Sequence, residues 1–406
     1  MKPGLRDYAA LAATTASGGL GLLLPLYLTH QGHSVGLVGV LTALGAVASL
    51  LSRIPLPLLY RPSRSRQLLL LTSVGGMVSS AVLPFMPDLV FFTLALLVNR
   101  VMGGLATSIY LARYLDMIGN AAGVERRRVM GYYGGTQAAG YAASSLFSGL
   151  LADYAGFEVA FLFTAAASGV AAAILITLPN PTGSQARETV VRPRPAGLFR
   201  GSLAAVDDPG LWGVLNVNTW NHFFHTINGS FFPVLATAVG LPPAQIGLIR
   251  ALYSGVNAVS RPVAWIFMGR LGLRQIAYVG IGLQAALLFA MPFVRDVLVF
   301  IAISAAFGLG RAVVVVATSA GLAEEVDDTR VSRGMATATY STSADVSNIG
   351  APLVGGLVAS LFGIAVMFPV TAVGFLACFV AGDVAVARWR ARRSSGIEQV
   401  PAPAPG

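Results

Sequence analysis

Long apolar runs separated by short polar gaps dominate the sequence. A helix needs about 20 apolar residues to cross a hydrocarbon layer of about 30 Å. Runs of this length are too long for barrel strands, and lipid offers no partners to free backbone N–H and C=O groups, so each run is predicted to be a helix. Twelve such runs occur, at about 8–28, 36–59, 68–86, 89–113, 129–151, 158–178, 211–238, 243–267, 275–294, 297–322, 334–361 and 363–386. We therefore predict an all-α polytopic membrane protein with twelve transmembrane helices.

The polar gaps predict the domain organisation. The longest one, rich in Pro, Arg and Ser, separates six runs from six. We expect an N-terminal six-helix bundle at 1–178, a cytoplasmic linker at 179–210 and a C-terminal six-helix bundle at 211–387. The end of the chain, 388–406, finishes in PAPAPG and is expected to be a disordered cytoplasmic tail.

Composition excludes the soluble classes of protein. Of the 406 residues, 55% are hydrophobic and 11% are charged, against roughly 25% charged in a soluble domain. A cytosolic enzyme, a secreted disulfide scaffold and a disordered chain are therefore excluded. The single cysteine, Cys378, lies within an apolar run, so no intrachain disulfide is expected.

The basic residues predict the orientation. The net charge is +10, but twenty Lys and Arg residues fall in alternate gaps beginning with the N-terminus, against Arg295 alone in the opposite gaps. This asymmetry favours both termini in the cytoplasm, with the charge facing the anionic surface of the lipid bilayer rather than a nucleic acid. The strong preference for Arg over Lys is typical of a GC-rich bacterial genome, which predicts the cytoplasmic (inner) membrane of a bacterium.

The two halves of the chain repeat one another. At an offset of 208 residues, GVLTALGAVASLLSRIP from Gly39 aligns with GLIRALYSGVNAVSRPV from Gly247. Near the end of each half, SGLLADYAG from Ser148 aligns with GGLVASLFG from Gly355 at an offset of 207. Paired halves of this kind are typical of transporters whose site lies between the repeats near the membrane midplane.

Four stretches resemble motifs of the major facilitator superfamily. SRPVAWIFMGRLGLR (260–274) is similar to the family's loop between the second and third helices of a half, and LVNRVMGGLA (97–106) to its helix 4 pattern. Gly131 and Gly140 in helix 5 and GAPLVGG (350–356) in helix 11 also resemble family elements. The resemblance, closest to drug/proton antiporters, implies a monomeric secondary transporter of two pseudo-symmetric bundles. It also implies a conformational role for Arg261, Arg270 and Arg274 in the loop.

Ionisable residues deep in the spans are candidates for function, because each costs about 2.5 to 3.5 kcal/mol near the bilayer centre. They are Arg100, Arg250, Arg311 and Asp345, whereas Arg53, Arg113 and Arg261 lie near enough to the cytoplasmic ends to snorkel. Desolvation favours the protonated form of a carboxylate and a nearby arginine favours the ionised form, so Asp345, with Arg311 and Arg100, is predicted to couple transport to protons. The alternative is a permanent ion pair of Asp345 with Arg311 or another arginine.

Polar side chains at helical spacing predict the substrate site. Helix 7 carries a stripe of Asn and His at intervals of three and four residues, which should line a cavity. His222 and His225 could bind a metal, relay protons or bond a substrate, and without a Cys or carboxylate on that helix we expect no metal. The proposed substrate-binding residues are Asn218, Asn221, His222, His225, Arg250, Tyr253, Asn257, Gln137, Tyr141 and Asn348.

The leading functional hypothesis is proton-coupled secondary transport of a small organic molecule by alternating access, with export by antiport as the favoured direction. The sequence contains no GxxxxGK[ST] phosphate loop and no HExxH element, so ATP coupling and metalloproteolysis lack their required groups, and no cofactor is expected. One rival is symport or exchange uptake of a carboxylate or phosphate metabolite, which the excess of deep arginines favours. Another is a membrane receptor or enzyme that transports nothing.

Overall fold

The computed structural model describes residues 3–86, 88–118, 123–178, 208–268, 272–328 and 333–397. Twelve helical spans follow one another along the chain. The first bundle contains α1 (Leu5–Ala16), η1 (Ser17–Gly19), α2 (Leu20–His30), α3 (Val35–Arg53), α4 (Leu56–Leu59), η2 (Pro62–Arg64), α5 (Ser65–Val82), η3 (Leu83–Phe85), α6 (Leu89–Ile118), α7 (Gly123–Tyr154) and α8 (Phe157–Thr177). The second contains α10 (Pro209–Ala238), α11 (Pro243–Met268), α12 (Leu273–Ala290), η4 (Met291–Phe293), α13 (Val297–Asp328), α14 (Arg333–Phe362) and α15 (Ile364–Ile397).

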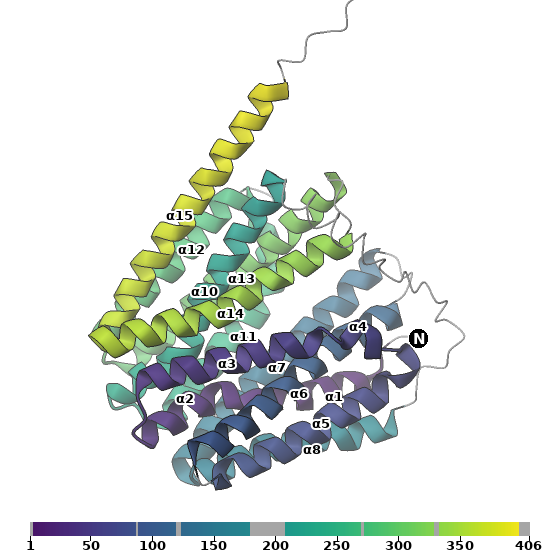
Figure 1. Cartoon of the computed structure of the whole chain (residues 1–406), viewed down its shortest axis with the longest axis vertical. Coiled ribbons are helices and arrows are strands. Elements are labelled where there is room, and N and C mark those ends of the chain that lie inside the picture. Colours follow the sequence, from purple (N-terminus) through teal and green to yellow (C-terminus); the bar gives the residue numbers. More distant parts are fainter. Residues whose placement is uncertain are drawn as a thin grey trace, which may run out of the picture.

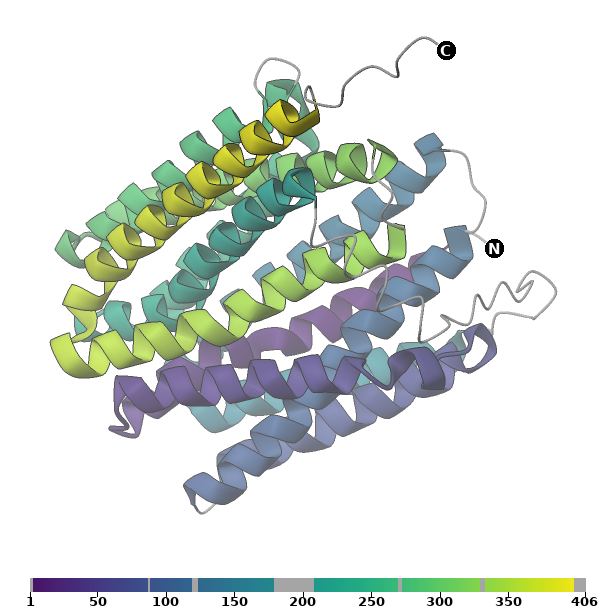
Figure 2. The same cartoon turned by 45° about the horizontal axis from the view of Figure 1, so that its top comes forward.

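The two bundles lie side by side, and their helices run back and forth between two faces of the molecule (Figures 1 and 2). We call the face where α1 and α10 begin and α15 ends the terminal face, and the opposite one the distal face. Tight turns at the distal face use glycine, since Gly32, Gly156, Gly240 and Gly363 all have φ between 76° and 90°. These four turns fall at corresponding places in the two halves.

Side-chain caps start several helices at the distal face. Ser34 accepts a hydrogen bond from the amide of Leu37 at the start of α3. Asp88 accepts from two backbone amides at the start of α6, and Asp296 does the same at the start of α13, 208 residues later. Capping satisfies amides that have no partner within the helix. The internal repeat of the sequence is therefore also a repeat of the turns and caps.

Among the described residues, contact between the bundles is made mainly by α3 with α14, α7 with α11, and α2 with α10, and α3 also touches α10. Close approach depends on glycine near the distal face. A Cβ on Gly149 would lie 2.7 Å from Gly247 Cα, and a Cβ on Gly39 would lie 2.9 Å from Gly356 Cα. Leu22 and Leu26 of α2 pack in one apolar cluster with residues of α10. The distal side is thus closed by tightly packed backbone.

Nine helical segments of the described chain are long and apolar enough to cross a membrane. The three spans outside that set, α7, α10 and α11, carry many of the polar residues that the sequence pointed to. These three helices lie at the boundary between the bundles, where their polar side chains face protein or a cavity rather than lipid.

Two helix ends fall inside segments that the sequence assigned to the linker and the tail. α10 begins at Pro209, after Asp208 caps its first turn through the amide of Gly210, so the linker ends two residues early. α15 continues to Ile397, so part of the segment 388–406 that we expected to be disordered is helical. Arginine, which occupies four of the positions 388–397, is a strong helix former. The remainder of the linker and tail lies outside the described residues.

Candidate functional site

A cavity of about 600 Å³ lies between the two bundles. Residues of α1, η1, α2, α3, α5, α6, α7 and α8 line it from the first bundle, and residues of α10, α11, α13 and α14 line it from the second. Its volume is typical of sites for small organic ligands. Ten of the residues predicted from the sequence line this cavity: Arg100, Gln137, Tyr141, His225, Arg250, Tyr253, Asn257, Arg261, Arg311 and Asn348.

One face of α11 supplies most of the wall from the second bundle. Arg250, Tyr253, Asn257 and Arg261 follow at intervals of three or four residues and therefore point the same way. The Arg250 guanidinium carbon lies 5.0 Å from the centroid of the Tyr253 ring, within the range of a cation–π contact. The Tyr253 hydroxyl is 2.7 Å from Nδ1 of His225, and the two rings stack. Arg261 donates from Nε to Asn257 Oδ1 at 3.0 Å.

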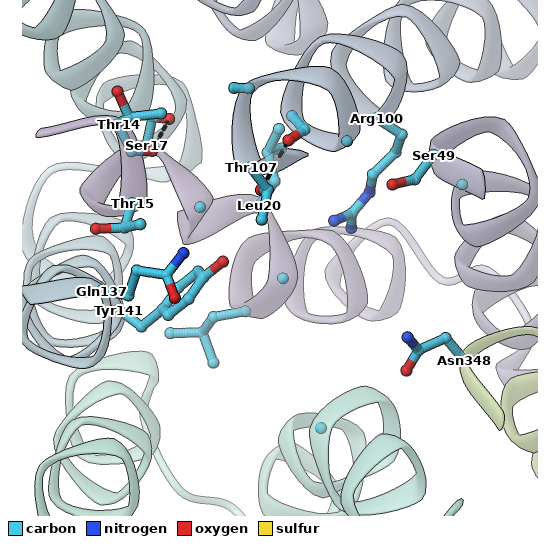
Figure 3. Close-up of a pocket in the computed structure, with 18 of the residues that line it drawn as sticks. Thr14, Thr15, Ser17, Leu20, Ser49, Arg100, Thr107, Gln137, Tyr141 and Asn348 are labelled. Atoms are coloured by element: carbon cyan, nitrogen blue, oxygen red, sulfur yellow. Dashed lines mark hydrogen bonds between the residues drawn. The ribbon is translucent and has the colours of Figure 1, made fainter. Parts of the chain in front are cut away.

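The other bundle faces this wall with Arg100, Gln137 and Tyr141. Figure 3 shows Gln137 and Tyr141 of α7, Arg100 of α6 and Asn348 of α14 around the same central space. The side chain of Arg100 runs against α3, where a Cβ on Gly45 would lie 2.9 Å from Arg100 Cγ. Gly45 therefore makes room for an arginine that would otherwise be displaced. Tyr141 keeps 43% of its surface accessible because it borders the cavity.

Unpaired hydrogen-bond donors mark the second bundle's side of the cavity. Arg311 is 9% exposed, and its Nη1 atom is buried without a hydrogen-bond partner. The Nη1 atom of Arg250 is in the same situation. Among the described residues, neither arginine forms an ion pair with an acidic side chain, and Arg100 forms none. Buried donors without acceptors are rare in folded proteins, and they are the groups that an anionic ligand would satisfy.

Asp345 pairs with an arginine of the other bundle. Arg53 Nη1, at the end of α3, lies 3.1 Å from Asp345 Oδ1 of α14 and also donates to Oδ2 at 3.3 Å. The partner is therefore not Arg311. Arg53 itself does not reach out to a lipid headgroup, which was the sequence expectation, although its side chain stays 35% exposed. Asp345 is not among the residues that line the cavity, whereas its partner Arg53 is.

Three of the four α10 residues proposed to bind substrate, Asn218, Asn221 and His222, do not line the cavity. Asn218 is fully buried and donates to the Ser343 hydroxyl at 2.7 Å, which ties α10 to α14. Asn221 is also fully buried and accepts from Gln284 Nε2 of α12 at 3.0 Å. His222 is partly buried, with its ring 6.4 Å from that of His225. The stripe is divided because α10 packs against several neighbours of its own bundle.

The three loop arginines have different places in the structure. Arg261 lines the cavity, as described above. Arg274 lies in the first turn of α12 and forms an ion pair with Asp383 of α15 at 2.7 Å, while its side chain stays 64% exposed. Arg270 lies outside the described residues. Among the described residues, no group of three or more metal-ligating side chains was found.

Two features of the site were missed from the sequence. The first span breaks at Ser17-Gly18-Gly19, where a Cβ on Gly18 would lie 2.8 Å from Tyr141, so the break lets α7 approach the cavity. Adjacent Ser and Gly residues in a span are the signal for such a break. Arg113, expected to snorkel, is 4% exposed and pairs with Asp7 at 3.0 Å while donating to Ser65. Asp7 stands in the first turn of α1, and its position in the sequence gives no sign of that partner.

Comparisons with known proteins agree with this architecture. A sequence profile of the Major Facilitator Superfamily matches residues 8–224 and 217–404. The fold is similar to two crystal structures of a bacterial homologue of the human lysosomal transporter Spinster. The inward-facing, unoccupied form has a TM-score of 0.71 and 13% identity over 95% of this chain and 94% of that one. The inward-facing, occupied form has a TM-score of 0.70 and 13% identity over 96% and 95%. A search of curated proteins gave no match.

Proposed function

The chain belongs to the Major Facilitator Superfamily and is a secondary transporter that works by alternating access, and we propose that its substrate is a small organic anion whose movement is coupled to protons. Family membership identifies a transporter and not an enzyme. In this family the carrier is embedded in a lipid bilayer, binds a small molecule and typically acts as a monomer.

One observation carries the proposal for an anion. Among the described residues that line the cavity, five are arginine and none is aspartate or glutamate: the arginines are Arg53, Arg100, Arg250, Arg261 and Arg311. Only Arg53 has an acidic partner, Asp345. A cationic substrate would be repelled by like charges in a partly desolvated space. A carboxylate or phosphate would instead accept hydrogen bonds from guanidinium N–H groups that have no other acceptor. Tyr253 and His225 supply further polar atoms for recognition.

Coupling to protons is proposed for Asp345 because its counter-charge belongs to the other bundle. Rocking of the bundles changes the distance between Arg53 and Asp345, because the two side chains lie on different bundles. Without the guanidinium, a partly buried carboxylate gains a proton more readily. Opening and closing of the bundles would thus load and release one proton. If the termini are cytoplasmic, as the basic residues predict, this distally closed structure is an inward-facing state.

Counterflow in liposomes tests the proposal. The purified protein would be reconstituted with an internal excess of inorganic phosphate, succinate, citrate or 3-phosphoglycerate, and uptake of the same labelled anion would be followed. We expect counterflow of at least one anion in the wild type and in Arg295→Ala, whose exposed arginine lies outside the cavity, and its loss in Arg311→Ala. Counterflow of cationic or neutral solutes without any anion would overturn the choice of substrate.

An imposed pH gradient tests coupling and direction. Asp345→Asn should abolish gradient-driven movement but keep counterflow, and Asp383→Asn, which removes a carboxylate outside the cavity, should keep both. Export by antiport, the direction proposed from the sequence, requires that an acidic exterior drive the anion outward. Uptake by symport requires that the same gradient drive it inward. Full gradient-driven transport by Asp345→Asn would remove Asp345 from the mechanism.

A further inference from the structure

The two main contacts between the bundles, α3 with α14 and α7 with α11, correspond position by position. Gly32 and Gly240, both with positive φ, precede α3 and α11 at an offset of 208 residues. Gly156 and Gly363, again with positive φ, follow α7 and α14 at an offset of 207. These turns fix the alignment of each helix pair independently of side-chain similarity. The close glycine contacts obey it too, since Gly149 meets Gly247 where Gly356 meets Gly39.

The alignment reveals one charged pair and one incomplete pair. Arg53 of α3 corresponds to Arg261 of α11, and each follows a serine. Asp345 of α14 corresponds to Ala138 of α7. The first contact therefore has an arginine and its carboxylate, while the second has the arginine and a methyl group in place of the carboxylate.

The surroundings of Arg261 agree with this correspondence. A Cβ on Gly134 would lie 3.7 Å from Arg261 Nη1, so the guanidinium already reaches across to α7. Gly134 is one helical turn before Ala138, and both Ala138 and Arg261 line the cavity. Arg261 is held by its Nε hydrogen bond to Asn257 on its own helix. Among the described residues, no acidic side chain forms an ion pair with it.

We propose that the anionic group of the substrate binds Arg261 against Ala138 of α7 and so takes the place that Asp345 occupies in the other contact. The inference rests on the proposed function, because it requires an anionic substrate. The Nη edge of Arg261, which faces α7, offers paired donors to one carboxylate or phosphate. The bound anion then joins α11 to α7 across the cavity as Asp345 joins α14 to α3, and binding favours approach of the bundles on the terminal side.

A carboxylate supplied by the protein itself tests this arrangement. Ala138→Asp places it where the alignment puts the counterpart of Asp345, and Ala138→Asn is the matched uncharged control. Thermal unfolding of the purified full chain would be followed in sodium chloride and in titrations with phosphate, succinate, citrate or 3-phosphoglycerate at constant ionic strength. A ligand that binds only the folded state raises the melting temperature.

We expect Ala138→Asp to melt at a higher temperature than Ala138→Asn in chloride, because it forms its own pair with Arg261. Its apparent affinity for the stabilising anion should be at least tenfold weaker than that of the control. Equal anion responses in the two variants would overturn the proposal.

If Ala138→Asp does not fold, Arg261→Gln tests the proposal instead, with Arg274→Gln as its control. A loss of anion affinity of at least tenfold in Arg261→Gln alone supports the proposal. An unchanged affinity in Arg261→Gln, together with a loss in Arg311→Ala, overturns this inference and leaves the proposed function standing. If no anion stabilises either the wild type or Arg274→Gln, the proposed function fails and this inference fails with it.

Discussion

Enlarging the distal glycine contacts should shift the balance between the two states of the carrier. In the structure a Cβ at Gly149 would lie 2.6 Å from the carbonyl oxygen of Pro243 and 2.7 Å from Gly247 Cα. Both neighbours are backbone atoms, so no side-chain rotation relieves the clash. An ordinary contact begins near 3.4 Å. The helices α7 and α11 must therefore separate by several tenths of an ångström in Gly149→Ala before the methyl group fits.

The magnitude follows from the energy of overpacking. Extra methyl groups in a tightly packed contact destabilise it by about 1 to 3 kcal/mol. The contact exists only when the distal side is closed, so this energy changes the ratio of distally closed to distally open molecules by about 5- to 150-fold in favour of the open state. Gly135→Ala is the matched control on the same helix, because a Cβ there meets no atom within 4 Å.

Distances between spin labels, measured by double electron–electron resonance, report the shift between distally closed and distally open molecules. Spin labels at Tyr154 and Phe293, which are exposed at the distal face in different bundles, report its opening once the exposed Cys378 is replaced by serine. We expect Gly149→Ala to add or enlarge a population at longer distance, and Gly135→Ala to leave the distribution as in the parent. If Gly149→Ala folds and its distances equal those of the control, the claim that this contact closes the distal side is refuted.

Further predictions concern stability and the cavity wall. Asp7→Asn leaves Arg113 buried without its counter-charge and should destabilise the fold by about 3 to 5 kcal/mol, seen as a clear fall in melting temperature. Asp383→Asn, whose partner is largely exposed, should leave the melting temperature nearly unchanged, and equal falls would contradict this contrast. Tyr253→Phe removes the bond to His225 but keeps the ring, so binding of the stabilising anion should weaken by about threefold to tenfold in a thermal-shift titration. An unchanged affinity would exclude that hydroxyl from recognition.

The fold could be predicted from the sequence because membrane helices carry their signal locally. Twelve apolar runs correspond to twelve helical spans, and the 208-residue repeat recurs in the caps Asp88 and Asp296. The cavity residues of α11 were also predictable, since Arg250, Tyr253 and Asn257 share a face at helical spacing. A polar residue in a span must face protein or water, so such residues can be recognised from the sequence as candidates for the cavity wall.

Partners distant in the chain could not be predicted in the same way. Arg53 and Asp345 are 292 residues apart, and the sequence around either residue does not indicate its partner. The polar residues of α10 show a different limit. Helical spacing predicts that Asn218 faces away from lipid, but it does not predict whether the side chain contacts α14 or the cavity. Arg113 near a helix end had the pattern of a snorkelling residue, yet Asp7 provides a buried alternative. These outcomes depend on how helices pack, which the sequence pattern does not encode locally.

Binding of simple solutes to the purified protein tests the central claim most directly. The claim is that an arginine-lined cavity between the bundles receives an anion. Matched carboxylate, amide and amine forms of one small molecule, such as succinate, succinamide and putrescine, would be titrated in a thermal-shift assay at constant ionic strength. We predict that among these the carboxylate form alone raises the melting temperature in a saturable way, and that Arg311→Ala abolishes the rise. Equal or greater stabilisation by the amine would contradict the account.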